Sequence, residues 1–527
     1  MVRTDAGAPR PSSPSLTSAR RERRETEKNV AVLAVLSVWI LLLIAISLKV
    51  AGLALDDMYI TYRYAHNLLS GNGLTFNPGE RVYGISDPGV GMLVAGGAAV
   101  SQLSIPTLGT ILMAMALLLI ASAVLWEAQK RGRFSEGAVA GTLIVTSPFL
   151  WIGQGSGPLV ALAILLLAAL LAERSPALSG ALAGIAVWCR PDALLGCAVL
   201  AWLIYRQKKR LPLAFAAGGA AVCAIGVAAA WAYYGRPLPS TLATKQDFAA
   251  RHIESFTGLH GFWGKALAIF KSSEGGWAQI LIPLGLLGSF YLYRNSGLAG
   301  RLVLVYGAAL ALGYTLLRIP FSIWYVGPAA AWIFLGAGFA LAGAARWAAR
   351  RFGTAGAAAV AAIVLIAIAW PVAAARTGWL KQDFSADWRR TAYRTAGEWL
   401  AKNTPSDADV AFDEMGIVGY FSQRPMLDLI GLVSPSSIPY MAAGDQVGAF
   451  LAKPTRYVLL HTHDRRGGTG PIVSRPWFPR CYRERVRIDL PRFKVSVIVY
   501  ERRRHRRLPP PRPPVDRRLT GGIASWR

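Results

Sequence analysis

Residues 55–88 read LDDMYITYRYAHNLLSGNGLTFNPGERVYGISDP and begin where the first long apolar run of the chain ends. They open on an adjacent acid pair, Asp56 and Asp57, which aromatic and basic side chains follow. Two carboxylates just beyond a membrane helix are costly unless they face water, a cation or a partner. This position predicts the catalytic loop of a membrane enzyme. The acids would suit a helix cap equally well, because MYITYRYAHNLL has apolar residues at helical spacing.

The composition is that of a polytopic membrane protein. Of the 527 residues, 54% are hydrophobic and 16% are charged. Runs of roughly 20 apolar residues, the length that crosses a bilayer as a helix, recur from residue 30 to residue 374. On a soluble protein the net charge of +28 would suggest a nucleic-acid partner. Here Lys and Arg flank the apolar runs, as they do on the cytoplasmic side of membrane helices, so we expect no nucleic acid.

Hydropathy and loop charge predict about eleven membrane spans, with the N-terminus in the cytoplasm. Residues 89–104 are short and Gly-rich, and the basic loop after residue 127 fits best if they form a juxtamembrane helix. Residues 51–105 then form the first outer loop, which carries both acids. After a first span that begins at residue 30, we expect spans at 106–127, 136–152, 157–172, 177–189, 193–205, 212–233, 277–293, 300–317, 322–345 and 355–374.

The chain divides into four parts by composition. Residues 1–29 form a basic tail that we expect to be disordered in the cytoplasm, and residues 30–375 form the membrane module. Residues 376–501 combine a helical pattern, DWRRTAYRTAGEWLAKN, with short β-like runs such as RYVLLHT. They predict a small α/β domain outside the membrane. The Pro-rich basic tail, residues 502–527, has the composition of a disordered segment.

Further charges on the predicted outer face accompany the acid pair. Arg190 and Asp192 interrupt two apolar runs, and Lys245 lies in a long outer loop. A carboxylate that acts as general base, beside cations that neutralise a phosphate leaving group, suits transfer of a phosphate-linked group. Each feature also has a structural explanation, such as a local ion pair at Arg190 or a solvated loop lysine at Lys245. The sequence HTHD at 461–464 resembles a metal pair, but a His-x-His pair on a strand is more often simply exposed, and we predict no metal site there.

The first loop resembles that of the C-fold (GT-C) glycosyltransferases that use polyprenyl-phosphate sugars. The resemblance is greatest to the branch of the mycobacterial terminal arabinofuranosyltransferases and their bacterial relatives. Later motifs fall in the family's order, which extends the resemblance over most of residues 50–435. They are WCRPDALL at 188–195, YYGRPLPSTLATK at 233–245, IWYVGP at 323–328 and EMGIVGYFSQRPMLDLIGLVSP at 414–435.

The resemblance implies a role for each matching residue. Asp56 would be the catalytic base, and Asp57 would support it or hold a divalent cation, Mg²⁺ or Mn²⁺. The residues expected to bind the donor phosphate or to position the loop are Arg63, Arg190 and Lys245, and those expected at the substrate are Tyr59, Glu80, Arg81, Asp192, Trp324 and Tyr325. The chain departs from the family where Tyr83 replaces an acid and where Ser156–Gly157–Pro158–Leu159 contains no acid. The sugar and the acceptor are therefore left open.

These observations predict an inverting glycosyltransferase in the bacterial inner or plasma membrane. It would transfer a sugar from a polyprenyl-phosphate donor to a glycan or lipid acceptor at the outer face, in contact with membrane lipids. No nucleotide-binding signature occurs in the sequence, which agrees with a lipid-linked donor. Two alternatives are a transporter or flippase of a lipid-linked saccharide, for which an internal repeat would be typical, and a non-catalytic scaffold for envelope assembly.

Overall fold

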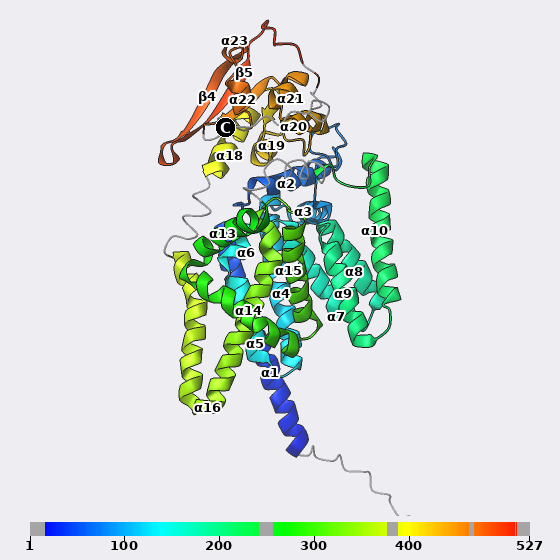
Figure 1. The fold of residues 1–527 in the computed structure, drawn as a ribbon, viewed down its shortest axis with the longest axis vertical. Coiled ribbons are helices and arrows are strands. Elements are labelled where there is room, and N and C mark those ends of the chain that lie inside the picture. Colours follow the sequence, from blue (N-terminus) through cyan, green and yellow to red (C-terminus); the bar gives the residue numbers. More distant parts are fainter. Residues whose placement is uncertain (1–15, 242–256, 377–387, 463–467, 512, 514–527) are drawn as a thin grey trace, which may run out of the picture.

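Apolar segments of the chain form helices that stand side by side in a bundle, with a small domain of helices and strands at one end (Figure 1). The structure is a computed structural model, and it describes residues 16–241, 257–376, 388–462, 468–511 and 513. Six helices in the described part of the chain are long and apolar enough to cross a membrane, and shorter apolar helices stand among them. The predicted fold class, a mainly helical polytopic membrane protein with a small C-terminal α/β domain, is confirmed.

A helix lies at every predicted span. The helices of the bundle are α1 (Leu16–Val50), α4 (Ile105–Lys130), α5 (Phe134–Thr146), α6 (Pro148–Ile152), α7 (Gly157–Leu171), α8 (Pro176–Cys189), α9 (Ala193–Lys208), α10 (Leu213–Tyr234), α14 (Ala278–Asn295), α15 (Leu298–Leu316) and α16 (Gly327–Arg376). Three differences from the expectation occur. The single span predicted at 136–152 forms two helices, α5 and α6, separated at Ser147. Helix α1 begins at Leu16, inside the tail that we expected to be disordered. Helix α16 covers the last two spans and turns between them at Gly353, whose φ of 63° lies in the left-handed region that favours glycine.

Small residues bring neighbouring helices of the bundle into backbone contact. A Cβ atom on Gly180 of α8 would lie 1.9 Å from the carbonyl oxygen of Phe215, and one on Gly218 of α10 would lie 2.1 Å from that of Ala177. Close packing of this kind drives helix association where lipid removes the hydrophobic driving force. The rest of α10 presents exposed apolar side chains such as Ile225 and Trp231, as expected of a helix that faces lipid.

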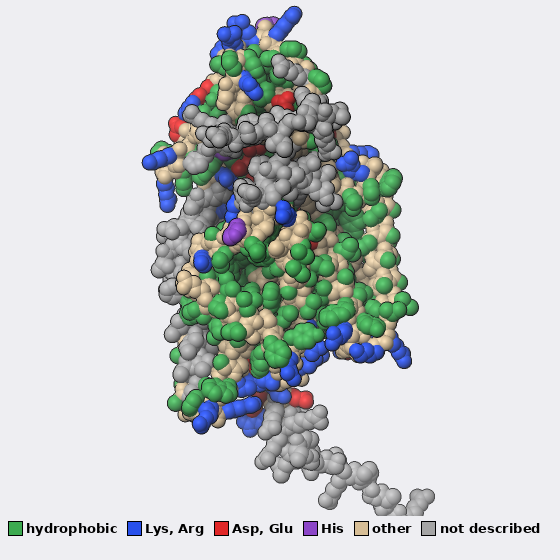
Figure 2. All heavy atoms as spheres, viewed as in Figure 1, with side chains coloured by type: hydrophobic (Ala, Val, Ile, Leu, Met, Phe, Trp, Pro, Cys, Tyr) green, Lys and Arg blue, Asp and Glu red, His purple; other side chains and the backbone are tan. Residues whose placement is uncertain are grey.

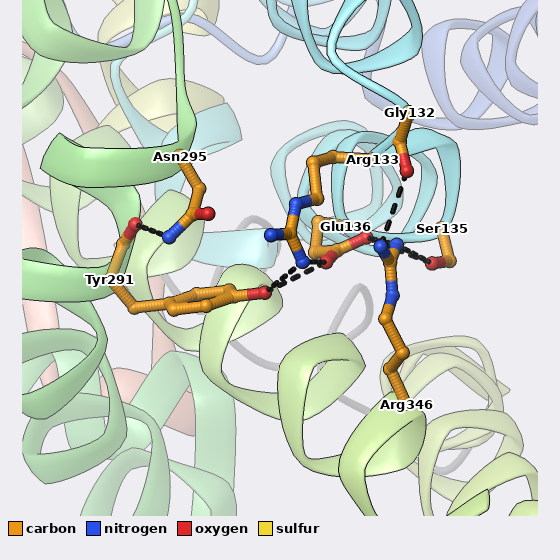
Figure 3. Close-up of polar contacts among 7 residues, drawn as sticks. All are labelled: Gly132, Arg133, Ser135, Glu136, Tyr291, Asn295 and Arg346. Atoms are coloured by element: carbon orange, nitrogen blue, oxygen red, sulfur yellow. Dashed lines mark hydrogen bonds and ion pairs between the residues drawn. The ribbon is translucent and has the colours of Figure 1, made fainter. Parts of the chain in front are cut away.

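Basic side chains gather at the end of the bundle away from the small domain (Figure 2). One buried carboxylate at this end, Glu136 of α5, holds three helices together (Figure 3). It accepts hydrogen bonds from Tyr291 of α14 at 3.0 Å and from Ser135 at 2.9 Å. It also pairs with Arg133 at 3.4 Å and with Arg346 of α16. Because the carboxylate is fully buried, these partners offset the cost of removing its charge from water.

Shorter helices lie between the bundle and the small domain (Figure 1). Helix α2 (Asp56–Leu69) begins with the acid pair, and α3 (Pro88–Ser101) covers most of the segment that we expected to be juxtamembrane. The others near this end are η1 (Leu259–Trp263), α13 (Gly264–Glu274), η2 (Gly275–Trp277) and η3 (Ile323–Val326).

The small domain is built on a five-stranded sheet with the order β2-β1-β3-β5-β4. Strands β1 (Val410–Phe412), β2 (Met426–Asp428) and β3 (Tyr457–His461) are parallel, whereas β4 (Tyr482–Leu490) and β5 (Val495–Arg502) are antiparallel. Helices α18 (Trp388–Asn403) and α19 (Met415–Ser422) pack against each other and connect it to α2. Shorter helices complete it: η4 (Pro435–Ser437), α20 (Ile438–Ala443), α21 (Gln446–Ala452), α22 (Gly470–Val473), α23 (Phe478–Cys481) and η5 (Pro491–Phe493).

One hydrophobic core spans the junction of this domain and the first loop. Tyr62 and Tyr64 of α2 are fully buried in the same cluster as Tyr393 of α18, Phe412 of β1 and Val418 of α19. Burial of aromatic side chains of this size dominates the energetics of an interface. The first loop and the small domain are therefore held as one unit, which fixes the position of the acid pair.

Candidate active site

A small cavity lies where the bundle, the first loop and the small domain meet. Its volume is about 50 Å³, which is room for only a few water molecules. Its walls combine charged residues with apolar ones from segments far apart in the sequence. They are Asp57, Met58, Ile60, Thr61, Gly84, Ile85, Ser86, Asp87, Arg190, Thr241, Trp324 and Leu432.

Two carboxylates of the first loop line this cavity. Asp57 lies in the first turn of α2 and is exposed. Asp87 precedes Pro88, which begins α3, and is buried. The hydroxyl of Thr61, one turn along α2 from Asp57, donates a hydrogen bond to the Asp87 carboxylate at 2.6 Å. The start of α2 and the start of α3 thus bring two acids of the first loop to the same space.

Arg190 supplies the positive charge of the cavity. It ends α8 where the helical pair breaks at Pro191, and its Nε atom lies 3.1 Å from the Asp192 carboxylate. The hydroxyl of Tyr314 donates to the same carboxylate at 2.6 Å, and the ring of Tyr325 lies 4.7 Å from the guanidinium carbon. These contacts hold the guanidinium in the cavity wall. Arg190 therefore forms the local ion pair with Asp192 and also lines the candidate site. Trp324 lines the same cavity. Asp192 and Tyr325 contact Arg190 but are not among the residues that line the cavity.

Asp56 points into the small domain and is not among the residues that line the cavity. Its two carboxylate oxygens accept hydrogen bonds from the backbone amides of Gly416 at 3.0 Å and Ile417 at 2.7 Å. These amides belong to the first turn of α19, where the helix dipole favours a negative group. Burial, and then the nearby Glu414 carboxylate, raise the pKa of Asp56 well above its usual range. Asp56 thus joins the first loop to the small domain.

Arg63 also lies in this junction, away from the cavity. Its side chain is fully buried and donates to the carbonyl oxygens of Phe76 at 2.7 Å, of Arg424 at 2.7 Å, and of Gly419. Burial lowers its pKa to about 9. The hydrogen bonds of Arg63 to these three carbonyl groups join the first loop to the small domain and fix their relative position.

The remaining predicted residues lie around the junction. The hydroxyl of Tyr59 donates to the carbonyl oxygen of Gly52 at 2.9 Å, and Glu80 pairs with Lys453 at 2.9 Å. Arg81 lies over the ring of Tyr233, with 5.0 Å from the guanidinium carbon to the ring centre. Lys245 lies outside the described residues. Of the residues predicted from the sequence, Asp57, Arg190 and Trp324 line the cavity itself.

The small domain contributes Leu432 to the cavity wall. Leu432 lies in a turn that follows β2 and is held by Asp428, the last residue of this strand. This buried carboxylate accepts hydrogen bonds from the amides of Ile430 at 2.8 Å and Val433 at 2.9 Å, and the chain curls around it. Burial raises its pKa to about 6. A Cβ atom on Gly84 would lie 2.6 Å from the carbonyl oxygen of Leu432. Only glycine allows the first loop to approach this wall so closely.

Nine of the twelve wall residues were not predicted as site residues, among them Thr61, Asp87, Thr241 and Leu432. Asp87 is a charged residue of the first loop, and the pair Asp87–Pro88 signals a helix start. It lies in the stretch after Gly84, however, where the resemblance to the family ends, and no pattern drew attention to it.

The residues at the cavity offer few ligands for a metal ion. In the described ranges no group of three or more His, Cys, Asp and Glu side chains lies close enough to hold one. Asp57 and Asp87 line the cavity together with the cation of Arg190. A divalent cation beside Asp56 and Asp57 remains a prediction. His461 of the HTHD motif packs against the rings of Trp388, Tyr393 and Phe412, and the last two residues of the motif, His463 and Asp464, lie outside the described part of the chain.

The structure aligns with ArnT from Cupriavidus metallidurans in the apo state, at 11% identity and a TM-score of 0.52, over 88% of this chain and 98% of ArnT. The chain has the fold of ArnT. ArnT bound to undecaprenyl phosphate aligns over the same shares of the two chains, at 12% identity and a TM-score of 0.51. This likeness confirms the predicted GT-C fold, whereas the arabinofuranosyltransferase branch stays a prediction.

Other comparisons cover the chain less well. The oligosaccharyltransferase of Archaeoglobus fulgidus, in complex with Zn and sulfate, aligns at 13% identity and a TM-score of 0.49, over 80% of this chain and 68% of its own. Residues 383–505 match a family described as a domain of unknown function (DUF8728). No curated protein matches the sequence.

Proposed function

We propose that this chain is a membrane glycosyltransferase that takes a sugar from a polyprenyl-phosphate donor and transfers it to an envelope glycan or lipid. The observation that carries the proposal is the meeting of Asp57, Asp87, Arg190 and Trp324 at one cavity of an ArnT-like fold. An acid, a cation and an aromatic ring at one place are the groups that deprotonate a hydroxyl, hold a phosphate and stack on a sugar.

The donor is proposed from the fold and from the position of the cavity. The ArnT structure that aligns here is bound to undecaprenyl phosphate. In our proposal the polyprenyl chain lies among the apolar helices, and its phosphate reaches Arg190 at the end of α8. The basic end of the bundle faces the cytoplasm under the positive-inside rule, so the cavity opens toward the outer side of the bacterial plasma membrane.

The base is proposed to be Asp57, although the family resemblance predicted Asp56. Asp57 lines the cavity, whereas both oxygens of Asp56 accept amide hydrogen bonds from α19. The acceptor hydroxyl gives its proton to Asp57 as its oxygen attacks the anomeric carbon. The bond from that carbon to the phosphate oxygen breaks, polyprenyl phosphate leaves with the bonding electrons, and the anomeric configuration inverts. Arg190 neutralises the charge that develops on the leaving phosphate.

The cavity has to widen before a sugar phosphate can enter it. Its volume of about 50 Å³ is room for a few waters, and the wall around Leu432 comes from the small domain. We propose that the acceptor enters past the exposed side chain of Asp57. The acids and the arginine of the cavity lie at one end of the bundle, and the sequence contains no internal repeat, whereas a flippase or transporter with a midplane site would typically have one.

The test is a transfer assay on the purified full-length chain in lipid nanodiscs. A panel of radiolabelled polyprenyl-phosphate pentoses and hexoses is supplied with an envelope lipid extract, and the release of polyprenyl phosphate and the labelled product are measured. We expect transfer from at least one donor and its loss in Asp57→Asn and Arg190→Gln. A flippase would instead move the intact donor across vesicles without releasing polyprenyl phosphate.

A further inference from the structure

A second cavity, much larger than the first, lies at the basic end of the bundle. Its volume is about 530 Å³, and its walls come from the ends of α4, α7, α9 and α15. Three cations, Lys130, Arg131 and Arg301, line it together with the apolar side chains of Leu170 and Leu298. A cavity of this size at the helix ends is not needed for the proposed sugar transfer, which occurs at the other end of the molecule.

Two of the cations of this cavity, Lys130 and Arg301, contact aromatic rings. The ammonium of Lys130 lies 4.7 Å from the centre of the Trp126 ring. The Nε atom of Arg301 donates to the carbonyl oxygen of Tyr293 at 3.0 Å, and its guanidinium carbon lies 5.1 Å from the centre of that ring. Over the part of the chain that the structure describes, neither these two cations nor Arg131 forms a salt bridge. The charges of Lys130 and Arg301 are therefore not neutralised by a salt bridge among the described residues, whereas Arg131 lies close enough to Glu127 to interact with its charge.

The two acids of the cavity accept hydrogen bonds from neutral donors. One oxygen of Glu127 accepts the amide of Ala299 at 2.8 Å and so caps the start of α15. Glu173 accepts a hydrogen bond from the side-chain amide of Gln207 at 2.9 Å. With three cations and two acids, the lining of the cavity carries a net charge of +1.

We propose that this cavity binds the phosphate head group of an anionic phospholipid of the leaflet at the basic end. The half-exposed Trp126 ring lies at the rim, and Trp side chains are typical of the boundary between hydrocarbon and head groups. Leu170 and Leu298 give the cavity an apolar side on which the acyl chains can lie. Basic pockets between membrane helices on the cytoplasmic side are known to bind such head groups. A soluble anion shares the phosphate chemistry but makes no use of the apolar side.

Native mass spectrometry of the full-length chain, released from detergent after titration with phosphatidylglycerol, tests this proposal. Phosphatidylcholine serves as the lipid without net charge, and inorganic phosphate serves as the soluble competitor. The variant Arg131→Gln/Arg301→Gln removes two cations from the cavity. Arg350→Gln/Arg351→Gln removes two exposed cations from α16 at the same end, outside the cavity, and is the matched control.

We expect one phosphatidylglycerol to bind in preference to phosphatidylcholine, and its affinity to fall by roughly 30-fold in the cavity variant. The control should bind as the unmodified chain does. Arg131→Lys/Arg301→Lys, which keeps both charges, should recover most of the binding and shows that misfolding is not the cause of the loss. An equal loss in the control, equal binding of both lipids, or displacement by inorganic phosphate at lipid-like concentration would overturn the proposal.

Discussion

Replacing Asp57 by Asn removes a carboxylate from the cavity at nearly constant size. A general base contributes roughly 100- to 10,000-fold to a rate, and we expect kcat for sugar transfer to fall within that range. The side chain of Asp57 is exposed, so the fold should tolerate the change. Release of radiolabelled polyprenyl phosphate gives the rate, and the melting temperature in detergent checks the fold. Asp407→Asn, at an exposed position of the small domain, is the matched control and should leave both values unchanged.

Asp56→Asn should loosen the junction between the first loop and the small domain, and its effect on the transfer rate should be only a consequence of this loosening. Asn keeps one acceptor oxygen, so one of the two amide hydrogen bonds from α19 is lost. A hydrogen bond to a charged group contributes about 1.5–3 kcal/mol, and the loss should appear as faster amide hydrogen exchange in α19 and α2. Transfer should fall only as far as the junction loosens. A full rate for Asp57→Asn, together with inactive Asp56→Asn whose hydrogen exchange is unchanged, would refute this reasoning and return the base to Asp56.

Three further changes test the packing around the site. Glu136→Ala leaves two arginines without their carboxylate and should lower the free energy of unfolding by roughly 3–5 kcal/mol, measured as reversible unfolding in mixed micelles. Gly180→Val places atoms against the backbone of α10 and should lower the free energy of unfolding by about 1–3 kcal/mol. Cross-linking of a cysteine pair introduced between α8 and α10 should become less efficient in this variant. Asp428, whose folded pKa of about 6 lies above its usual 3.8, binds its proton more tightly when folded. The stability that this bound proton gives to the folded state is fully present below about pH 4 and is lost as pH rises through 6. The melting temperature of the unmodified chain should therefore fall over this pH range, and that of Asp428→Asn should not.

The bundle was predictable from the sequence because hydrophobic length and flanking charge act locally. A run of apolar residues near Trp39 or Ile120 specifies a membrane helix whatever it packs against. The bend of α16 at Gly353 separates two spans that hydropathy had already distinguished. The extent of α1 was not predictable in the same way, since the basic residues before residue 30 have a composition typical of a disordered tail.

The division of roles within the acid pair was not predictable from local pattern. Asp56 and Asp57 are adjacent, yet Asp56 meets the amides of α19 at Gly416 and Ile417, hundreds of positions later in the chain. Such a contact depends on how the small domain docks. Asp87 also depends on tertiary structure, because folding of the first loop brings it beside Thr61 at the cavity. Sequence reasoning located the loop, and tertiary structure decided which side chains face the cavity.

The proposed sugar transfer is tested most directly by following donor consumption on the unmodified chain and on Asp57→Asn side by side. Both proteins, in identical nanodiscs, receive each labelled polyprenyl-phosphate sugar with an envelope lipid extract. We predict that the unmodified chain releases polyprenyl phosphate from at least one donor and forms a product of inverted anomeric configuration, and that Asp57→Asn does so at least roughly 100-fold more slowly. No release from any donor, or equal rates for the two proteins, would contradict the proposed function.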